Sequence, residues 1–396
     1  MMLITIIFWT LVFVVFYAYI GYGMLLFIII RLRRLFGLGK PYDGNLDYQP
    51  EITLLVAAYN EKDYVIRKVE NSLQLDYPRD KVKMVWVTDG SDDGTPDILA
   101  RFSDITVLHQ PERRGKIAAM NRAVKMVKTP IIVFSDANTA LGKDSLRLIV
   151  DMFRNPKVGC VSGEKRIQGQ DSETAAGAGE GIYWKYESTL KKWDAEWYSV
   201  VGAAGELFAV RTELYQDVEP DTLLDDFIIS LRIAMKGYTI QYNPEAFASE
   251  TASATVKEEL KRKIRISAGG IQSIVRLRAL LNIFKYGRLS FQYISHRVLR
   301  WSLAPLSLLF ILILNVILFI KEIQTGNPGF YSLLFAGQVF FYLCSILGWI
   351  LENRHIRVKV LFVPYYFFIM NLCMYLGLLR FLRGKQSANW ERAKRA

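Results

Sequence analysis

Cysteine is scarce in this sequence: only Cys160, Cys344 and Cys373 occur among 396 residues. The three are scattered, so they form neither the close pairs of a metal cluster nor a disulfide framework. A chain with neither feature fits a reducing compartment. The GxxxxGK[ST] spacing of a P-loop is also absent, which excludes that class of nucleotide-binding site.

Charge is missing from several long stretches. Residues 4–30, "ITIIFWTLVFVVFYAYIGYGMLLFIII", contain no charged side chain, and a helix of that length spans a hydrocarbon core of roughly 30 Å. Residues 302–320, 329–350 and 360–379 are similar, although Pro364 is expected to break the last one. Buried helices of soluble proteins rarely run so long without charge, so these patterns predict a membrane protein.

The flanks of these runs predict their orientation. No small-residue cleavage site follows the first run, so we expect a retained helix rather than a cleaved signal. Arg31, Arg33, Arg34 and Lys40 follow it, and such an excess of positive charge marks the cytoplasmic side. Basic residues also stand on both sides of the last run, which favours a broken or re-entrant segment and a cytoplasmic tail.

The chain has a net charge of +12, but its hydrophobic content of 52% is more than a soluble nucleic-acid binder usually carries. We therefore expect no nucleic-acid partner. Residues 251–300 hold eleven Lys and Arg against Glu258 and Glu259. Apolar residues recur among them at helical spacing: Leu260, Ile264, Ile271 and Val275. This pattern indicates an amphipathic helix on an anionic membrane surface, with an ordinary solvated helix as the alternative.

Between the apolar runs, strand-like and helical segments alternate. The strand-like runs are residues 51–59, 82–90, 105–110 and 131–136. Alternation of this kind predicts a parallel sheet covered by helices on both faces. Ligands of such sheets bind beyond the carboxyl ends of the strands, where this chain places Asn60, Glu61, Asp89 and Asp136.

Two loops at these strand ends have residues suited to a nucleotide. In "DGSDDGT", residues 89–95, Asp89 is placed to accept hydrogen bonds from a nucleobase, although a simple capped turn is the alternative. In "RRGKIAAMN", residues 113–121, Gly115 lets the backbone approach a phosphate and Lys116 neutralises it. A solvated basic loop is the alternative there.

The strand "IIVFSDANTA", residues 131–140, ends in a carboxylate and an amide, Asp136 and Asn138. Near a nucleotide and a basic loop, an acid at a strand end suits a divalent cation on a diphosphate. We therefore expect Mg²⁺ or Mn²⁺ here.

The ordered set "AAYNE", "VTDGSDDGT", "RGK…N", "FSDANT", "LLDDF" and "RKIR" resembles the family 2 glycosyltransferases. It is most like their membrane-embedded branch, which includes cellulose and hyaluronan synthases, and the likeness covers roughly residues 50–300. The resemblance implies a GT-A fold with a Rossmann-like mixed sheet. It also implies inverting transfer from a nucleotide sugar, commonly a UDP-sugar, to a saccharide or lipid-linked acceptor in cell-surface glycan synthesis.

With this resemblance the chain divides into four parts. They are an N-terminal transmembrane helix (1–34), a GT-A domain (48–250), amphipathic interfacial helices (251–300) and a C-terminal transmembrane region with a basic tail (301–396). We expect a multi-pass protein of the bacterial inner or plasma membrane whose catalytic domain is cytoplasmic.

The resemblance also assigns roles on the donor side. Asn60, Glu61 and Asp89 would contact the base and ribose, and Lys116 and Asn121 would lie near the diphosphate.

Asp136 matches the first acid of the family's DxD motif, whereas Asn138 stands at the second. An amide ligates a hard cation without charge, so the metal site should be weaker or lean on Asp136 and the diphosphate oxygens.

The segment "DTLLDDFIISLRIAMKGY", residues 221–238, matches the family's acidic motif before a helix. Inverting transfer needs a base for the acceptor hydroxyl, and we expect Asp226 in this role with Asp225 as neighbour or alternate. Two acids that simply favour a helix N-terminus are the alternative.

Arg262 and Arg265 keep the family's R-x-x-R spacing and would neutralise the departing nucleoside diphosphate. Ile266 stands where processive relatives have a tryptophan that lines the acceptor entrance, which weakens the case for a long polymer threaded through the membrane. Residues 206–211 resemble the family's acceptor-side segment. Tryptophans placed to stack on sugars, with core packing as the alternative, are Trp184, Trp193, Trp197 and Trp301.

Asn138 and Ile266 also motivate a second hypothesis, a non-catalytic nucleotide-sugar-binding scaffold of a polysaccharide synthesis or export assembly. Donor hydrolysis by the detergent-solubilised protein separates the two hypotheses.

Overall fold

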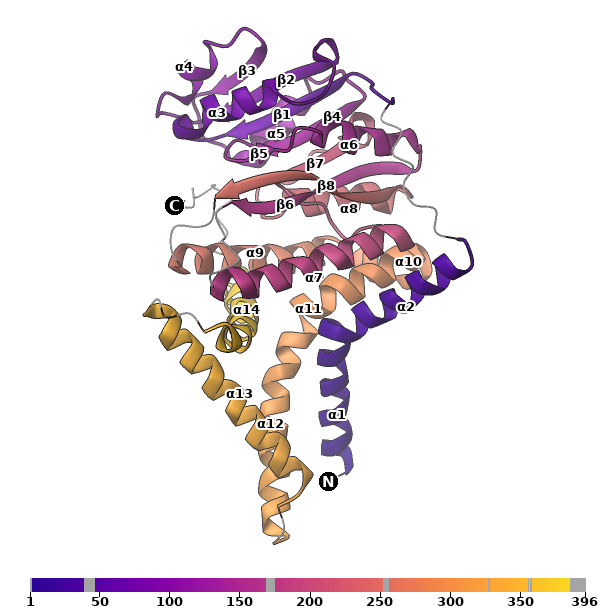
Figure 1. Ribbon diagram of the computed structural model, residues 1–396, viewed down its shortest axis with the longest axis vertical. Coiled ribbons are helices and arrows are strands. Elements are labelled where there is room, and N and C mark those ends of the chain that lie inside the picture. Colours follow the sequence, from indigo (N-terminus) through magenta and orange to yellow (C-terminus); the bar gives the residue numbers. More distant parts are fainter. Residues whose placement is uncertain are drawn as a thin grey trace.

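The computed structural model describes residues 2–38, 47–168, 175–251, 256–326, 328–354, 356 and 358–384. A sheet domain lies at one end of the molecule and long apolar helices extend from the other (Figure 1). A layer of helices separates them. The basic tail from residue 385, Lys40 and Arg357 lie outside the described residues.

The sheet has eight strands in the order β3-β2-β1-β4-β7-β6-β8-β5. Their bounds are β1 Ile52–Ala58, β2 Val82–Asp89, β3 Ile105–Gln110, β4 Ile131–Asp136, β5 Ala140–Leu141, β6 Val158–Gln168, β7 Leu207–Arg211 and β8 Thr239–Thr251. The four strands predicted from alternation are parallel, as expected. Strand β7 is antiparallel to both β4 and β6, so the whole sheet is mixed.

Helices cover both faces of the sheet. Helices α3 (Lys62–Leu73), α4 (Thr95–Leu99) and α6 (Ser145–Asp151) pack on one face, and α5 (Lys116–Val124) and α8 (Asp225–Met235) pack on the other. Strand β1 is buried at every position because Leu54 and Val56 face the first group while Leu55 and Ala57 face the second. The central strands are thereby fixed, and their carboxyl ends hold polar side chains in place.

The intermediate layer contains α7 (Ala175–Trp197), α9 (Val256–Arg276), α10 (Ile283–Tyr293) and the short α11 (Leu299–Trp301). Figure 1 shows α7 and α9 beneath the sheet, and α14 packs against both. Helix α9 contains the basic, amphipathic segment that the sequence predicted, and it carries the R-x-x-R arginines.

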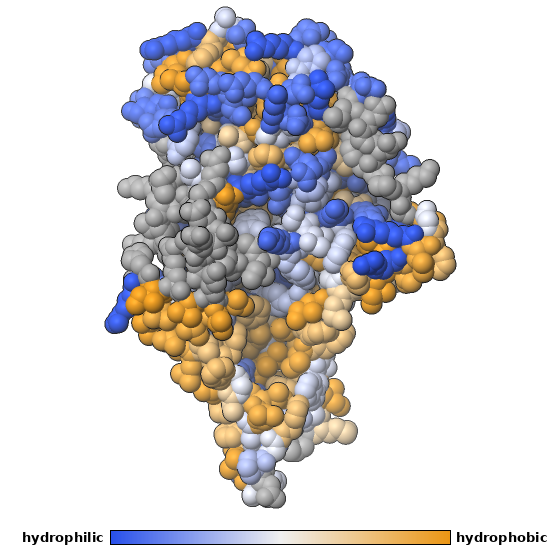
Figure 2. Space-filling view, in the orientation of Figure 1, coloured by the Kyte–Doolittle hydropathy of each residue, from blue (hydrophilic) through white to orange (hydrophobic). Residues whose placement is uncertain are grey.

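The remaining helices are α1 (Met2–Phe16), α2 (Tyr22–Leu35), α12 (Leu303–Gln324), α13 (Phe330–Asn353) and α14 (Lys359–Leu382). In the described part, four helical stretches are long and apolar enough to cross a membrane: Met2–Leu35, Leu303–Gln324, Phe330–Glu352 and Val360–Leu382. Hydrophobic residues cover the narrow end of the molecule, and hydrophilic ones cover the sheet domain (Figure 2). The chain is a membrane protein, as its uncharged runs predicted.

Helix α14 differs from its neighbours in direction. Figure 1 looks nearly along its axis, whereas α12 and α13 run down the page, and α14 packs against α9 and α13. The expected break at Pro364 is wrong, because the helix is continuous from Lys359 to Leu382. Pro364 stands near the amino end, where a missing backbone N–H removes only one early hydrogen bond.

Candidate active site

A cavity of about 960 Å³ lies between the sheet and the helix layer. Its walls come from strand ends of the sheet, from α5 and α8, and from α7, α9 and α14 of the helical part. A volume of this size is typical of a small-molecule site. Of the residues predicted for the site, the cavity brings together Glu61, Lys116, Asp136, Asn138, Asp225, Asp226, Arg262 and Arg265.

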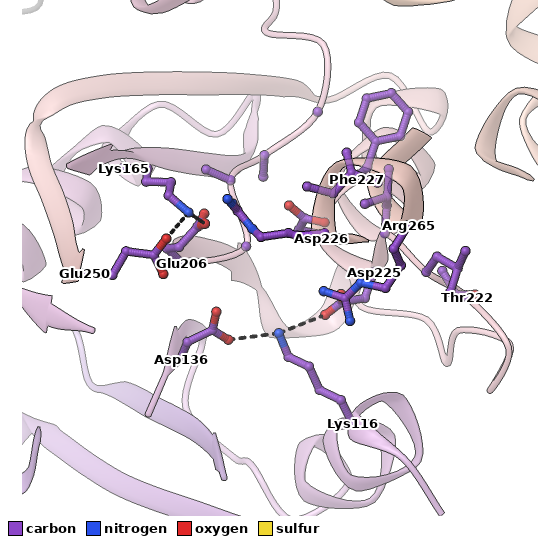
Figure 3. Close-up of a pocket in the computed structure, with 18 of the residues that line it drawn as sticks. Lys116, Asp136, Lys165, Glu206, Thr222, Asp225, Asp226, Phe227, Glu250 and Arg265 are labelled. Carbon is purple, nitrogen blue, oxygen red and sulfur yellow. Dashed lines mark hydrogen bonds and ion pairs between the residues drawn. The ribbon is translucent and has the colours of Figure 1, made fainter. Parts of the chain in front are cut away.

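Lys116 lines the cavity and links its acids. Helix α5 begins at this residue because Gly115, with φ of 95°, turns the chain in a conformation that favours glycine. Figure 3 shows the lysine reaching between two acids: its Nζ lies 2.9 Å from Asp136 Oδ1 and 3.7 Å from Asp225 Oδ2. Burial opposes the charged form, but these two carboxylates outweigh it and raise the pKa of Lys116 above its usual range. The lysine therefore stays positive beside the acids.

Asp226 stands beside Asp225 at the start of α8 and closes the cavity next to Gly205. Burial, the charge of Asp225 and the charge of Glu206 together raise the pKa of Asp226 to about 8. Lys116 pulls this pKa in the opposite direction without cancelling the shift. A carboxyl group that exchanges its proton near neutral pH is suited to general acid–base chemistry.

Asp136 and Asn138 both line the cavity. Within the described ranges, no group of three or more His, Cys, Asp or Glu side chains is placed to hold a metal ion. One carboxylate and one amide nevertheless match a hard cation that takes its other ligands from substrate phosphates, which is the usual binding mode of Mg²⁺. These residues therefore fit a cation that arrives with a diphosphate.

Asp89 lies at the end of β2, just outside the main cavity and next to Lys116 in a small adjoining one. Its Oδ2 accepts hydrogen bonds from the backbone N–H groups of Arg114 (2.8 Å) and Gly115 (2.6 Å). Its Oδ1 is buried and has no hydrogen-bond partner among the described residues. A buried acceptor of this kind calls for a donor, such as the N–H of a nucleobase.

Besides Asp89, two predicted donor-binding residues, Asn60 and Asn121, do not line the main cavity. Asn60 exchanges hydrogen bonds of 2.8 and 3.0 Å with Asp92, so its side chain joins two loops. Asn121 accepts a hydrogen bond from the Tyr215 hydroxyl (2.7 Å) and donates one to the Val218 carbonyl (2.9 Å). Both side-chain amides thus form hydrogen bonds within the protein, and motif spacing along the sequence does not predict these bonds.

The R-x-x-R arginines come from α9. Arg262 donates to Glu259 at 3.2 Å, and Arg265 points toward the acids of α8 (Figure 3). Ile266 also lines the cavity. Trp301 of α11 lies in the same wall, against Phe227 with ring centroids 5.1 Å apart. The cavity therefore holds a tryptophan, although from another position than the sequence motif suggested.

The other tryptophans divide by location. Trp184 lines the cavity. Trp193 packs against Phe27 and Trp197 packs against Phe291, with ring centroids 5.7 and 5.6 Å apart. Trp193 and Trp197 therefore serve packing, which was the alternative to stacking on a sugar.

A buried cluster of charged side chains in the cavity was not predicted as part of the site. Lys165 of β6 lies 2.6 Å from Glu206 and pairs with Glu250 of β8 (Figure 3). Although burial acts in the opposite direction, Lys165 and Arg262 lower the pKa of Glu206 to about 2. Glu206 opens the acceptor-side segment and offered a signal, whereas Lys165 and Glu250 belong to no motif.

Known proteins share sequence similarity with this chain. The sequence profile described as "Glycosyltransferase like family 2" matches residues 50–269. Poly-beta-1,6-N-acetyl-D-glucosamine synthase of Staphylococcus aureus (strain MSSA476) is 27% identical over 262 residues, which are 64% of this chain and 62% of that protein. The synthase of the same name from Staphylococcus epidermidis is 26% identical over 251 residues, 60% of each chain. The matched region is thus under two thirds of these relatives' length.

A solved structure of the mannosyltransferase PcManGT from Pyrobaculum calidifontis, in complex with GDP-Man and Mn²⁺, has a similar fold. The TM-score is 0.72 at 22% sequence identity, and the match covers 96% of this chain and 99% of that one. The likeness includes the helical part as well as the sheet domain, and it confirms the GT-A fold expected from the motifs.

Proposed function

The chain belongs to the glycosyltransferase-like family 2, and we propose that it is a membrane-bound inverting glycosyltransferase of cell-surface glycan synthesis. It would move a sugar from a nucleotide-sugar donor to a saccharide or lipid-linked acceptor. The observation that carries the proposal is a single cavity holding a carboxyl group of raised pKa, Asp226, next to the Lys116–Asp136 ion pair.

The proposed reaction is one displacement. The acceptor hydroxyl gives its proton to Asp226 while its oxygen forms a bond to the anomeric carbon of the donor. The bond from that carbon to the diphosphate breaks, and its electron pair stays on the diphosphate oxygen. Lys116, Arg262 and Arg265 face the same cavity and would neutralise the departing charge. Asp225 would hold Lys116 in place.

Asp136 and Asn138 would hold Mg²⁺ or Mn²⁺ together with donor oxygens. When bound, the cation would supply positive charge for the leaving diphosphate. The proposal is supported by the two side chains in the cavity and by the Mn²⁺ in the structure of the related mannosyltransferase.

Donor recognition would rest on Asp89 and Glu61. The buried Oδ1 of Asp89 offers an acceptor to the base, and Glu61 lines the main cavity. The family resemblance favours a UDP-sugar, whereas the solved mannosyltransferase contains GDP-Man. A donor panel must therefore include both nucleotides.

We propose that the sheet domain lies in the cytoplasm of a bacterial cell and that the apolar helices anchor it in the inner or plasma membrane. The support is the basic cluster Arg31, Arg33 and Arg34 at the sheet-domain end of the first apolar run.

The test is a panel of UDP- and GDP-sugars given to the full chain in detergent with Mg²⁺ or Mn²⁺. Release of nucleoside diphosphate and the mass of the products are measured together. We expect turnover with at least one donor, and an anomeric configuration opposite to that of the donor. Donor binding without any hydrolysis or transfer would instead support the non-catalytic scaffold.

A further inference from the structure

Helix α14 approaches α9 more closely than a side chain would permit. A Cβ atom added at Gly377 would lie 2.6 Å from Ser267 Cβ and 2.8 Å from the backbone nitrogen of Ala268. Contacts that short require glycine at the crossing. The contact falls two residues beyond Arg265, so it places the last turn of α14 beside the R-x-x-R arginines.

This crossing brings a basic residue of the last apolar helix into the candidate active site. Arg380, three residues after Gly377, lines the same cavity as Arg262, Arg265 and Asp226. Its neighbour Arg383 is exposed at the end of α14. An arginine at the end of a membrane helix commonly extends to water; Arg383 does so, whereas Arg380 faces the cavity.

Arg265 and Arg380 line the same wall of the cavity. Within the residues that the structure describes, neither Arg265 nor Arg380 makes a hydrogen bond or an ion pair. Burial, followed by the positive charges of Arg262 and Arg380, lowers the pKa of Arg265, and Asp225 and Asp136 offset only part of this effect. Like charges held together away from water are unfavourable until an anion joins them.

We propose that Arg380 and Arg265 together form a binding site for a phosphate group, which the last apolar helix completes. The planar guanidinium fork matches the oxygens of phosphate in a way that a lysine does not. The identity of the phosphate-bearing ligand depends on the proposed function. That source is the diphosphate of the donor or the phosphate of a lipid-linked acceptor.

The first experiment measures binding without turnover. The full chain in detergent is titrated with inorganic pyrophosphate and, separately, with a polyprenyl phosphate, using the uncharged polyprenol as reference. We expect Arg380→Gln to weaken binding of at least one phosphate ligand by about 10- to 100-fold, the value of one charged hydrogen-bonding partner. Arg383→Gln, which removes the exposed arginine, is the matched control and should bind as the unchanged protein does.

The two ligands distinguish the sources. Loss for pyrophosphate alone assigns the site to the donor diphosphate, and loss for polyprenyl phosphate alone assigns it to the lipid-linked acceptor. Loss for both means that the two phosphates share the site. Equal affinity of Arg380→Gln and the unchanged protein for both ligands would overturn the proposal. Since no sugar is transferred in these titrations, a failure of the proposed function leaves this result unaffected.

A second measurement separates binding from folding. Because Arg380 adds repulsion to the ligand-free protein, Arg380→Gln should unfold at the same or a higher temperature without ligand and gain less from pyrophosphate or polyprenyl phosphate. Arg380→Glu should remain folded, because a carboxylate there attracts Arg265, yet lose binding of whichever ligand Arg380→Gln weakens. If Arg380→Gln lowered the unfolding temperature of the ligand-free protein and left ligand binding unchanged, Arg380 would have only a structural role, contrary to the proposal.

Discussion

The two walls of the cavity differ in how their charged side chains are paired. On the sheet side, charged groups already face one another, because Lys116 lies between Asp136 and Asp225. On the helix side, Arg265 and Arg380 face the cavity without a hydrogen bond or ion pair in the described part of the chain. The sheet side therefore resembles a site prepared for proton transfer and a cation, whereas the proposed role of Arg265 and Arg380 on the helix side is to bind a phosphate.

The walls also differ in how the chain builds them. The sheet side comes from the ends of neighbouring parallel strands and the helices that follow them, so sequence order and spatial order agree. The helix side joins α7, α9, α11 and α14, which lie far apart along the chain. A nucleotide sugar that binds between the walls would contact both sets of charges. Substitutions on the two sides should therefore have different effects on the transfer rate and on ligand binding.

Loss of the proposed base should have the largest effect. Asp226→Asn keeps the shape but removes the proton acceptor, so transfer should fall by about 10²-fold or more while donor binding changes little. Initial rates and donor titrations on the same preparation measure both. Asp221→Asn, at an exposed acid paired with Arg276 outside the cavity, is the control. Near-normal turnover of Asp226→Asn would remove this residue from the mechanism.

Removal of the proposed cation ligand should act on binding instead. Asp136→Ala leaves Lys116 without its nearest carboxylate and takes away the only charged ligand proposed for the metal. We expect metal-dependent donor binding to disappear in calorimetry, while metal-independent binding persists through the arginines. Full activity of the unchanged protein with excess chelator would contradict the metal role.

The pH dependence of kcat/KM should reflect the ionisation of Asp226 on the sheet side and not the arginines of the helix side. A general base acts only when it is deprotonated, and the pKa of Asp226 is raised to about 8. The value of kcat/KM for the donor should thus rise by about tenfold per pH unit below that pKa and level off above it. The same profile measured for Arg380→Gln should keep its shape. A flat profile between pH 5 and 8 would mean that no such base limits the rate.

The smallest effect is expected at Asn138. Asn138→Asp adds one negative charge beside the proposed cation with nearly the same shape, so metal binding without donor should tighten. Transfer should change only modestly, because the donor brings its own diphosphate charge. Metal titrations with and without nucleotide measure the difference. Equal affinities under both conditions would show that Asn138 serves the turn after β4 rather than the cation.

Local pattern was sufficient for much of the molecule. Uncharged runs long enough to span a membrane predicted the apolar helices, because no other packing accommodates so many apolar residues in sequence. Alternating strands and helices predicted the parallel strands β1–β4, and polar residues at their ends predicted Glu61 and Asp136 as cavity residues. The basic loop predicted Lys116, and the family's acidic motif predicted Asp225 and Asp226. Each of these features depends on residues that are close in the chain or on neighbouring strand ends.

Only the tertiary structure decided the rest. Asn60 and Asn121 match motif positions, yet their hydrogen bonds go to Asp92 and to the segment at Tyr215, because a side chain binds whatever the fold brings near it. The continuous course of α14 through Pro364 likewise depends on its place in the helix. Arg380 belongs to no motif, and it reaches the cavity because Gly377 lets two helices touch that are about a hundred residues apart in sequence. Long-range packing of this kind leaves no local pattern. The sequence therefore determined the sheet side of the cavity and the R-x-x-R arginines of α9, whereas only the fold brought Arg380 to them.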